Sequence, residues 1–80
     1  MRFGRPTKRS VTIAGHETSV SLEAVYWAAL EAAAVEESLP LNALIAQIDV
    51  ARLDGAPPPN LASALRQWLM ARAVEGREGG

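Results

Sequence analysis

The chain has 80 residues, of which 49% are hydrophobic and 21% charged, and it contains no cysteine. A chain of this length forms one domain with a small core, and such domains commonly need disulfides, a metal ion or a second subunit. Disulfides are excluded, and a metal site is not expected because His16 is the only histidine. The composition favours oligomerisation and leaves little room for an enzyme pocket.

Charge is distributed unevenly along the chain. The net charge is −1, but residues 1–9 hold four of the eight basic side chains and no acid. Residues 10–80 therefore carry a net charge of −5. A basic arm of this kind either attracts a polyanion such as DNA or solubilises a disordered terminus. No signal peptide and no membrane-spanning run of roughly 20 apolar residues is found, which predicts a cytoplasmic protein.

Two short strands are predicted after this arm. Residues 1–8 lack apolar periodicity, so we expect a flexible segment. Apolar and polar residues alternate over 9–14 and again over 17–22, as in half-buried strands. Gly15-His16 has the form of a two-residue hairpin turn, and we interpret His16 as a turn residue rather than a ligand. In that register Val11 lies opposite Val20, and Ile13 lies opposite Thr18.

Three helices are predicted in the remainder of the chain, over residues 23–37, 41–54 and 60–74. The first segment is rich in Ala and Glu and has no Gly or Pro. The second has apolar residues at the i, i+3, i+4, i+7 spacing of an amphipathic helix, and the third follows a proline-rich linker with Asn60 as its N-cap. Residues 75–80 are predicted to be a disordered tail.

The adjacent aromatic residues Tyr26 and Trp27 cannot both face one core. We predict that Tyr26 packs inward, and that Trp27 meets the third helix or a second subunit. The alternative is that one ring is exposed and awaits a partner. Trp68 lies on the apolar stripe of the third helix and is predicted to be buried.

No catalytic constellation is found. The chain has no cysteine nucleophile, no glycine-rich phosphate loop, and one histidine that is distant in sequence from any serine and aspartate set. The sequence therefore predicts a protein that is not an enzyme and has no cofactor and no metal.

The predicted strands lead to a dimer. A two-stranded hairpin leaves unpaired edges and is marginal by itself. Pairing of one edge with a twofold mate would bury Val20 and Leu22 of both chains. A second subunit would thereby supply the stabilisation that a domain of this length commonly lacks by itself.

The stretch Thr18 to Arg52 resembles the ribbon-helix-helix fold of small bacterial repressors such as Arc and MetJ, and of many antitoxins. Residues 9–72 are still more similar to a group of short, mostly uncharacterised bacterial ribbon-helix-helix domain proteins. The matching pieces are KRSVTIAGH at residues 8–16, TSVSLE at 18–23, Tyr26-Trp27, and NLASALR at 60–66.

This resemblance implies a mostly α-helical fold with an N-terminal strand or hairpin and an added third helix, in an intertwined homodimer. It also implies a transcriptional regulator whose β-ribbon enters the major groove of double-stranded DNA. The residues expected to contact DNA are Arg2, Arg5, Lys8, Arg9, Ser19, Ser21 and Asn42. The residues expected in the dimer core are Val20, Leu22, Tyr26, Leu30, Leu44, Ile45 and Ile48.

Two departures from the family pattern support an alternative function. Glu17 places a carboxylate on the expected DNA face, and Pro40 replaces the Ser or Thr that commonly begins the second helix. The acidic residues 10–80 also differ from the usual basic character of DNA-binding domains. The alternative is an antitoxin-like or scaffold module that keeps the dimer, binds a protein and has lost DNA binding.

Overall fold

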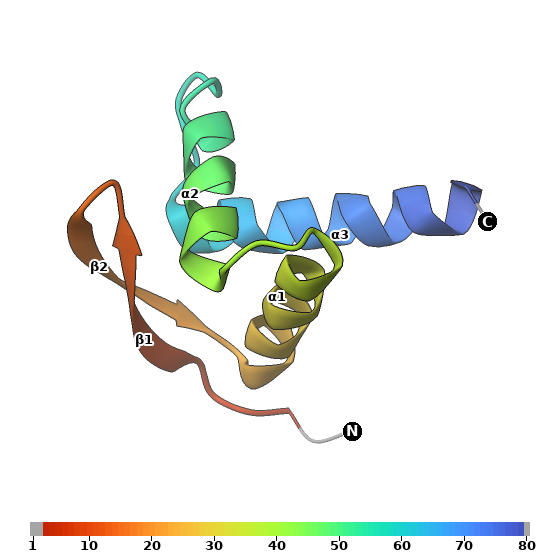
Figure 1. Cartoon of the computed structure of the whole chain (residues 1–80), viewed down its shortest axis with the longest axis horizontal. Coiled ribbons are helices and arrows are strands. Elements are labelled where there is room, and N and C mark those ends of the chain that lie inside the picture. Colours follow the sequence, from red (N-terminus) through yellow and green to blue (C-terminus); the bar gives the residue numbers. More distant parts are fainter. Residues whose placement is uncertain (1–2, 80) are drawn as a thin grey trace.

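A computed structural model describes residues 3–79. A hairpin lies along one side of three helices (Figure 1). The mostly α-helical fold class with an N-terminal hairpin is confirmed. The elements are β1 (Thr7–Ile13), β2 (His16–Leu22), α1 (Ala24–Glu36), α2 (Leu41–Arg52) and α3 (Leu61–Gly79).

The hairpin turn consists of Ala14 and Gly15, which have φ angles of 51° and 80°. Positive φ at both central residues is typical of the type I′ turn, whose twist matches that of the flanking strands. The predicted turn at Gly15-His16 is therefore wrong, and so is the predicted register: Val11 pairs with Thr18, and Val20 pairs with Arg9. The turn lies one residue earlier because glycine occupies its second central position rather than its first.

Strand β1 begins at Thr7, so the last two residues of the predicted flexible arm belong to the sheet. The reason is a tertiary contact: the indole Nε1–H of Trp27 donates a hydrogen bond to the backbone carbonyl of Thr7 at 2.9 Å. Trp27 is buried, whereas Tyr26 is only half-buried. Tyr26 was predicted to pack inward, and Trp27 to meet the third helix or a second subunit. Instead Trp27 is the buried ring of the two, because β1 covers the side of α1 that carries it.

One apolar core joins the hairpin to the three helices. Residue 11 of β1 and residues 20 and 22 of β2 contribute to it, and each helix adds a stripe. The buried members are Val11, Val20, Leu22, Trp27, Leu30, Ala33, Ala34, Leu44, Ile45, Ile48, Ala64 and Leu65. Trp68 packs against this cluster but remains partly exposed, so its predicted burial is only partial.

The helix ends have local causes. Helix α1 ends in a left-handed cap at Ser38, where φ is 57° and Leu39 N–H donates to the carbonyl of Ala34. Asn60 caps α3 as predicted, since its Oδ1 accepts a 2.8 Å hydrogen bond from the Ser63 N–H. Helix α2 ends two residues earlier than predicted, because a tighter turn of 3.1–3.2 Å hydrogen bonds follows Arg52.

Helix α3 continues to Gly79, so residues 75–79 are helical and the predicted disordered tail is wrong over that range. No proline follows Asn60, and each added residue of a helix gains one backbone hydrogen bond. Within residues 3–79, no helix is long and apolar enough to cross a membrane.

Candidate nucleic-acid interface

The side of the hairpin that faces away from the helices carries only polar side chains. Alternation along the strands places Val11 and Val20 on the buried side, and their neighbours in sequence on the other. Three cross-strand pairs form this second side, and all six residues are exposed. We call it the outer face; its pairs are Lys8–Ser21, Ser10–Ser19 and Thr12–Glu17.

The outer face presents a dense set of hydrogen-bonding groups. Each of its four hydroxyl groups both donates and accepts, the Lys8 ammonium only donates, and the Glu17 carboxylate only accepts. A two-stranded β-ribbon is one of the elements that fit a DNA major groove about 12 Å wide. The outer face therefore has both the width and the chemistry needed to contact base edges.

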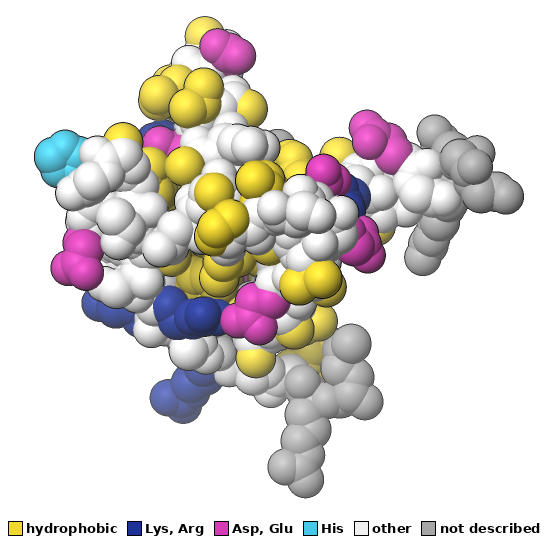
Figure 2. All heavy atoms as spheres, in the orientation of Figure 1, with side chains coloured by type: hydrophobic (Ala, Val, Ile, Leu, Met, Phe, Trp, Pro, Cys, Tyr) yellow, Lys and Arg dark blue, Asp and Glu magenta, His cyan; other side chains and the backbone are white. Residues whose placement is uncertain are grey.

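Positive charge lies at the open end of the outer face and negative charge at its turn end. Lys8 pairs with Ser21, at the base of the hairpin, whereas Glu17 lies next to the turn. Arg5 is exposed just before β1. Figure 2 shows the same separation, with basic side chains over the lower part of the hairpin and acidic and histidine side chains nearer its tip.

Arg9 is not on the outer face. It lies opposite Val20, on the side of β1 that faces the helices. Its Nη1 lies 2.8 Å from Oε1 of Glu31, and its guanidinium carbon lies 4.6 Å from the centre of the Trp27 ring. Among the four predicted basic contacts of the arm, Arg5 and Lys8 are thus exposed, Arg9 is engaged within the chain, and Arg2 is outside the described residues.

The first turn of α2 lies beside the hairpin. The Thr12 N–H points to Oδ1 of Asn42 at 3.4 Å, which brings the helix start next to the outer edge of β1. No side chain caps α2, and its first N–H to find a backbone acceptor is that of Leu44. The preceding N–H groups and the positive end of the helix dipole favour an anion at this position.

Sequence reasoning placed Glu17, Ser19 and Ser21 on the outward side but missed Ser10 and Thr12. The predicted register differs from the observed one by two residues, which changes the partners of Ser10 and Thr12 but not their side. The available signal was the alternation of residues 8–13, in which Lys8, Ser10 and Thr12 share one side.

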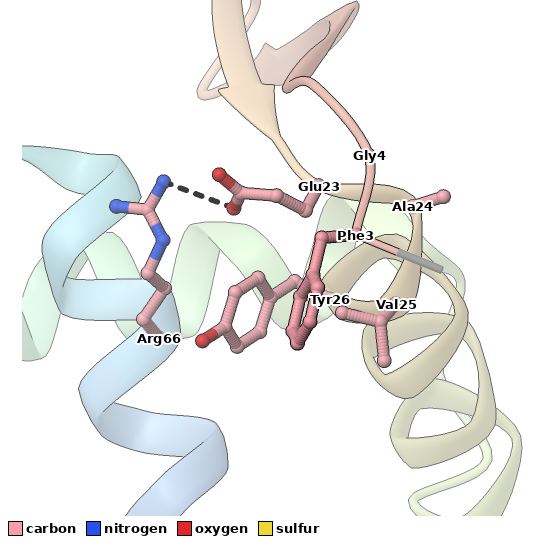
Figure 3. Close-up of a pocket in the computed structure, with 7 residues that line it drawn as sticks. All are labelled: Phe3, Gly4, Glu23, Ala24, Val25, Tyr26 and Arg66. Carbon is pink, nitrogen blue, oxygen red and sulfur yellow. Dashed lines mark hydrogen bonds and ion pairs between the residues drawn. The ribbon is translucent and has the colours of Figure 1, made fainter. Parts of the chain in front are cut away.

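A hollow lies between the start of α1, α3 and residues 3–4, away from the outer face (Figure 3). Nη2 of Arg66 lies 3.3 Å from Oε1 of Glu23, and the guanidinium lies over the Tyr26 ring. A backbone hydrogen bond lowers the pKa of the Glu23 carboxyl; burial opposes this shift and the Arg66 guanidinium adds to it. The other residues that line the hollow are apolar. It therefore offers no nucleophilic side chain with a general base beside it. In residues 3–79 no three His, Asp or Glu side chains are grouped to hold a metal ion.

The protein-family comparison identifies this architecture. A family model described as "Ribbon-helix-helix domain" matches residues 6–73. The chain belongs to the ribbon-helix-helix family. The predicted resemblance is confirmed, and proteins of this family are typically dimeric DNA-binding regulators or antitoxins with a non-enzymatic fold. Neither the search of curated proteins nor the search of solved structures found a match.

Within the chain, the described part of the ribbon-helix-helix domain already has two paired strands. The resemblance implies one strand from each of two subunits, but here β1 lies beside β2 as the second strand. Six of the seven predicted dimer-core residues are already buried within the chain, with exposed fractions between 0% and 4%. The seventh, Tyr26, is partly buried against the same core, and the Arg66 guanidinium of α3 lies over its ring. Burial of these residues therefore does not require a second subunit.

Proposed function

We propose that this ribbon-helix-helix protein is a cytoplasmic, homodimeric transcriptional regulator that inserts the outer face of its hairpin into the DNA major groove. The observation that carries the proposal is the outer face itself: six exposed polar side chains on a ribbon two strands wide. No exposed apolar side chain interrupts it.

The central pair Ser10–Ser19 lies where base edges are closest to an inserted ribbon. Their hydroxyl groups contact either donors or acceptors, so they confer limited specificity. Glu17 accepts a hydrogen bond from a cytosine amino group, which is the base contact that suits a carboxylate. Glu17 thereby favours a cytosine at one position and disfavours sites where its charge meets phosphate.

Lys8 and Arg5 supply the phosphate contacts, together with the first turn of α2. Three other arginines are committed to ion pairs with acidic neighbours: Arg52 with Asp49, Arg66 with Glu23, and Arg72 with Glu36 and Glu37. The backbone N–H groups of Leu41 and Asn42, with the Asn42 side chain, hold a further phosphate in place of a hydroxyl at Pro40. Among the side chains that the structure describes, few cations are free of ion pairs, which implies modest affinity for non-specific DNA.

The test is fluorescence anisotropy with random-sequence duplexes of about 30 base pairs, followed by selection of bound sequences. We expect binding that weakens steeply with salt, and a Lys8→Gln change that lowers affinity about tenfold at about 50 mM salt. The matched control is Gln67→Glu, which lowers the net charge by the same amount as Lys8→Gln but at an exposed position of α3. We expect it to change DNA affinity less than about twofold. We choose point substitutions because a deletion of residues 1–9 would also remove part of β1.

Salt-insensitive binding, or none at low salt, would overturn the DNA proposal. It would favour the second candidate, an antitoxin-like or scaffold module that binds a protein. Glu17 on the outer face and the net charge of −5 over residues 10–80 support this candidate. If it holds, Glu17→Lys should create DNA binding that the unmodified chain lacks.

A further inference from the structure

The hollow beside the start of α1 combines two opposite charges with apolar walls. Its volume is about 550 Å³, which is within the range of small-molecule sites. Glu23 and Arg66 contribute the charges, and Phe3, Val25 and Tyr26 contribute apolar surface. In Figure 3 the side chains of Glu23 and Arg66 point toward each other, with the Tyr26 and Phe3 rings below them. The hollow therefore presents both members of an ion pair next to aromatic rings.

The Glu23–Arg66 pair is looser than the other ion pairs of α3. Nη2 of Arg66 lies 3.3 Å from Oε1 of Glu23, whereas such charged hydrogen bonds usually measure about 2.7–2.9 Å. Farther along α3, Arg72 lies 2.6 Å from Glu36 and 2.7 Å from Glu37. A guanidinium has several N–H donors, and a carboxylate accepts several hydrogen bonds. Both members of the loose pair can therefore bind a further charged group.

The aromatic surface beside this pair is open to solvent. Phe3 is 95% exposed and Val25 is 58% exposed. Tyr26 is half-buried, and the guanidinium carbon of Arg66 lies 5.6 Å from the centre of its ring. Aromatic rings attract other rings through offset and edge contacts, in addition to the burial of apolar area. A ligand with an aromatic ring would therefore gain contacts with Phe3 and Tyr26 that water does not supply.

We propose that this hollow binds a free aromatic α-amino acid as a zwitterion. The α-carboxylate accepts hydrogen bonds from the guanidinium of Arg66, and the α-ammonium donates to the carboxylate of Glu23. Both charges of an α-amino acid are carried on one carbon atom, so they are close enough to meet the two members of the ion pair together. The aromatic ring of the ligand then lies against Phe3 and Tyr26.

Charge balance favours a zwitterion over other aromatic ligands. A ligand with only a carboxylate is attracted by Arg66 but repelled by Glu23, and a ligand with only an ammonium group meets the reverse. A zwitterion satisfies both side chains and leaves the total charge of the hollow unchanged. An amino acid within a peptide has lost at least one of these two charges. The site therefore favours the free amino acid over either end of a peptide.

The site adjoins the segment that approaches DNA in the proposed function. Phe3 lines the hollow, and Arg5 follows two residues later, just before β1. A ligand that packs against Phe3 restricts the motion of this segment before DNA does so, which lowers the entropy lost when Arg5 meets a phosphate. The amino acid is therefore an effector that increases DNA affinity. This consequence rests on the proposed function, whereas binding of the amino acid does not.

The test of the site is a heteronuclear NMR titration of the full chain with L-phenylalanine and L-tryptophan. We expect a dissociation constant of about 1 mM or lower, as suits a small ligand at an open site. The amide signals that shift should be those of residues 3–5 and 23–26. Arg66→Gln and Phe3→Ala should each weaken binding about tenfold. Because Phe3 is 95% exposed, its replacement should leave the fold intact.

The matched control is Arg72→Gln. Arg72 also pairs with carboxylates and lies over an aromatic ring, that of Trp68, but it does not line this hollow. Its replacement should change the affinity for L-phenylalanine by less than about twofold. If Arg72→Gln weakened binding as much as Arg66→Gln and Phe3→Ala, or if the latter two had no effect, the proposed site would be wrong.

Three analogues test the contacts of the ligand one at a time. 3-Phenylpropanoate lacks the ammonium group, 2-phenylethylamine lacks the carboxylate, and L-alanine lacks the ring. Each should bind about tenfold more weakly than L-phenylalanine, or more weakly still. No binding of either aromatic amino acid, or equally strong binding of a single-charge analogue, would overturn the proposal.

DNA measurements separate this inference from the proposed function. Saturating L-phenylalanine should increase DNA affinity about threefold, and Phe3→Ala should abolish the increase. An unchanged DNA affinity with the amino acid bound would overturn its role as an effector. Amino-acid binding by a chain that does not bind DNA would support the site and reject the DNA proposal. Salt-dependent DNA binding by a chain that binds neither amino acid would do the reverse.

Discussion

The hairpin and helix α1 differ in how they distribute apolar residues. In the hairpin, period-two alternation sends Val11 and Val20 to the core and leaves only polar groups on the outer face. In α1, the buried Leu30 and the exposed Val35 lie on different sides of a helix that is apolar nearly all round. The hairpin has one side that packs in the core and one polar side that is exposed. Helix α1 has two apolar sides, of which only one packs in the core of the chain.

A polar surface and an apolar surface suit different kinds of partner. Exposed hydroxyl groups stay solvated until a ligand replaces water with its own donors and acceptors. An exposed aliphatic side gains free energy from any apolar contact that excludes water. The same small chain thus combines a polar face on the hairpin with an exposed apolar side on α1.

The largest expected effect separates the two sides of the hairpin. Val20→Asp places a carboxylate in the core and should destabilise the fold by about 4 kcal/mol or more, which is enough to unfold so small a domain. Ser21→Asp, on the outer face of the same strand, should change the free energy of unfolding by less than about 0.5 kcal/mol. Urea denaturation measures both. Equal effects would show that the strand does not present two distinct sides.

The next effect compares the two sides of α1. Ala34 is buried, so Ala34→Leu should overpack the core and cost about 2 kcal/mol. Ala28 is exposed, and Ala28→Leu should cost less than about 0.5 kcal/mol in dilute, monomeric protein. Thermal unfolding followed by circular dichroism checks the pair. If Ala34→Leu were as stable as the unmodified chain, the packing of α1 against α2 and α3 would be contradicted.

A smaller effect tests the contact that joins the two regions. Trp27→Phe keeps most of the buried ring but removes the donor to the Thr7 carbonyl, and should cost about 1 kcal/mol. The loss of stability should be greatest at the start of β1. Amide hydrogen exchange should therefore increase more there than at residues 17–21. Uniform acceleration along both strands would indicate that this hydrogen bond does not anchor the strand.

The smallest effect is a pH dependence at the junction between β2 and α1. The folded-state pKa of Glu23 lies below its ordinary value of 4.5, through a backbone hydrogen bond and the Arg66 guanidinium. The contribution to stability is therefore complete above the ordinary value and is lost as pH falls through the lowered pKa. The stability difference between the unmodified chain and Glu23→Gln should shrink as pH falls from about 6 to about 3. A constant difference would argue against this coupling.

Much of the fold follows from local patterns in the sequence. Alternation over residues 8–13 and 17–22, the helical spacing from Leu41, and the cap at Asn60 each act over a few neighbouring residues. Such patterns predicted the strands and helices in the correct order. The register failed because it depended on which of two residues took the first turn position, and one residue there changes every cross-strand partner.

The candidate site was predicted only in part. Ser19 and Ser21 lie on the outer face as expected, because their side follows from the burial of Val20 and Leu22. Arg9 was expected to contact DNA, yet it points to the helices and pairs with Glu31, which is 22 residues away in sequence. No local pattern specifies a contact at that separation.

Three features follow from the amino-acid sequence alone: the order of the elements, the polar character of one side of the hairpin, and membership of the ribbon-helix-helix family. Three others depend on packing in three dimensions: β1 pairs with β2 in the observed register, Trp27 rather than Tyr26 is buried in the core, and one side of α1 is exposed within the chain. The physical reason is that periodicity fixes which residues share a side of an element. Packing between elements distant in sequence fixes which of those sides is buried.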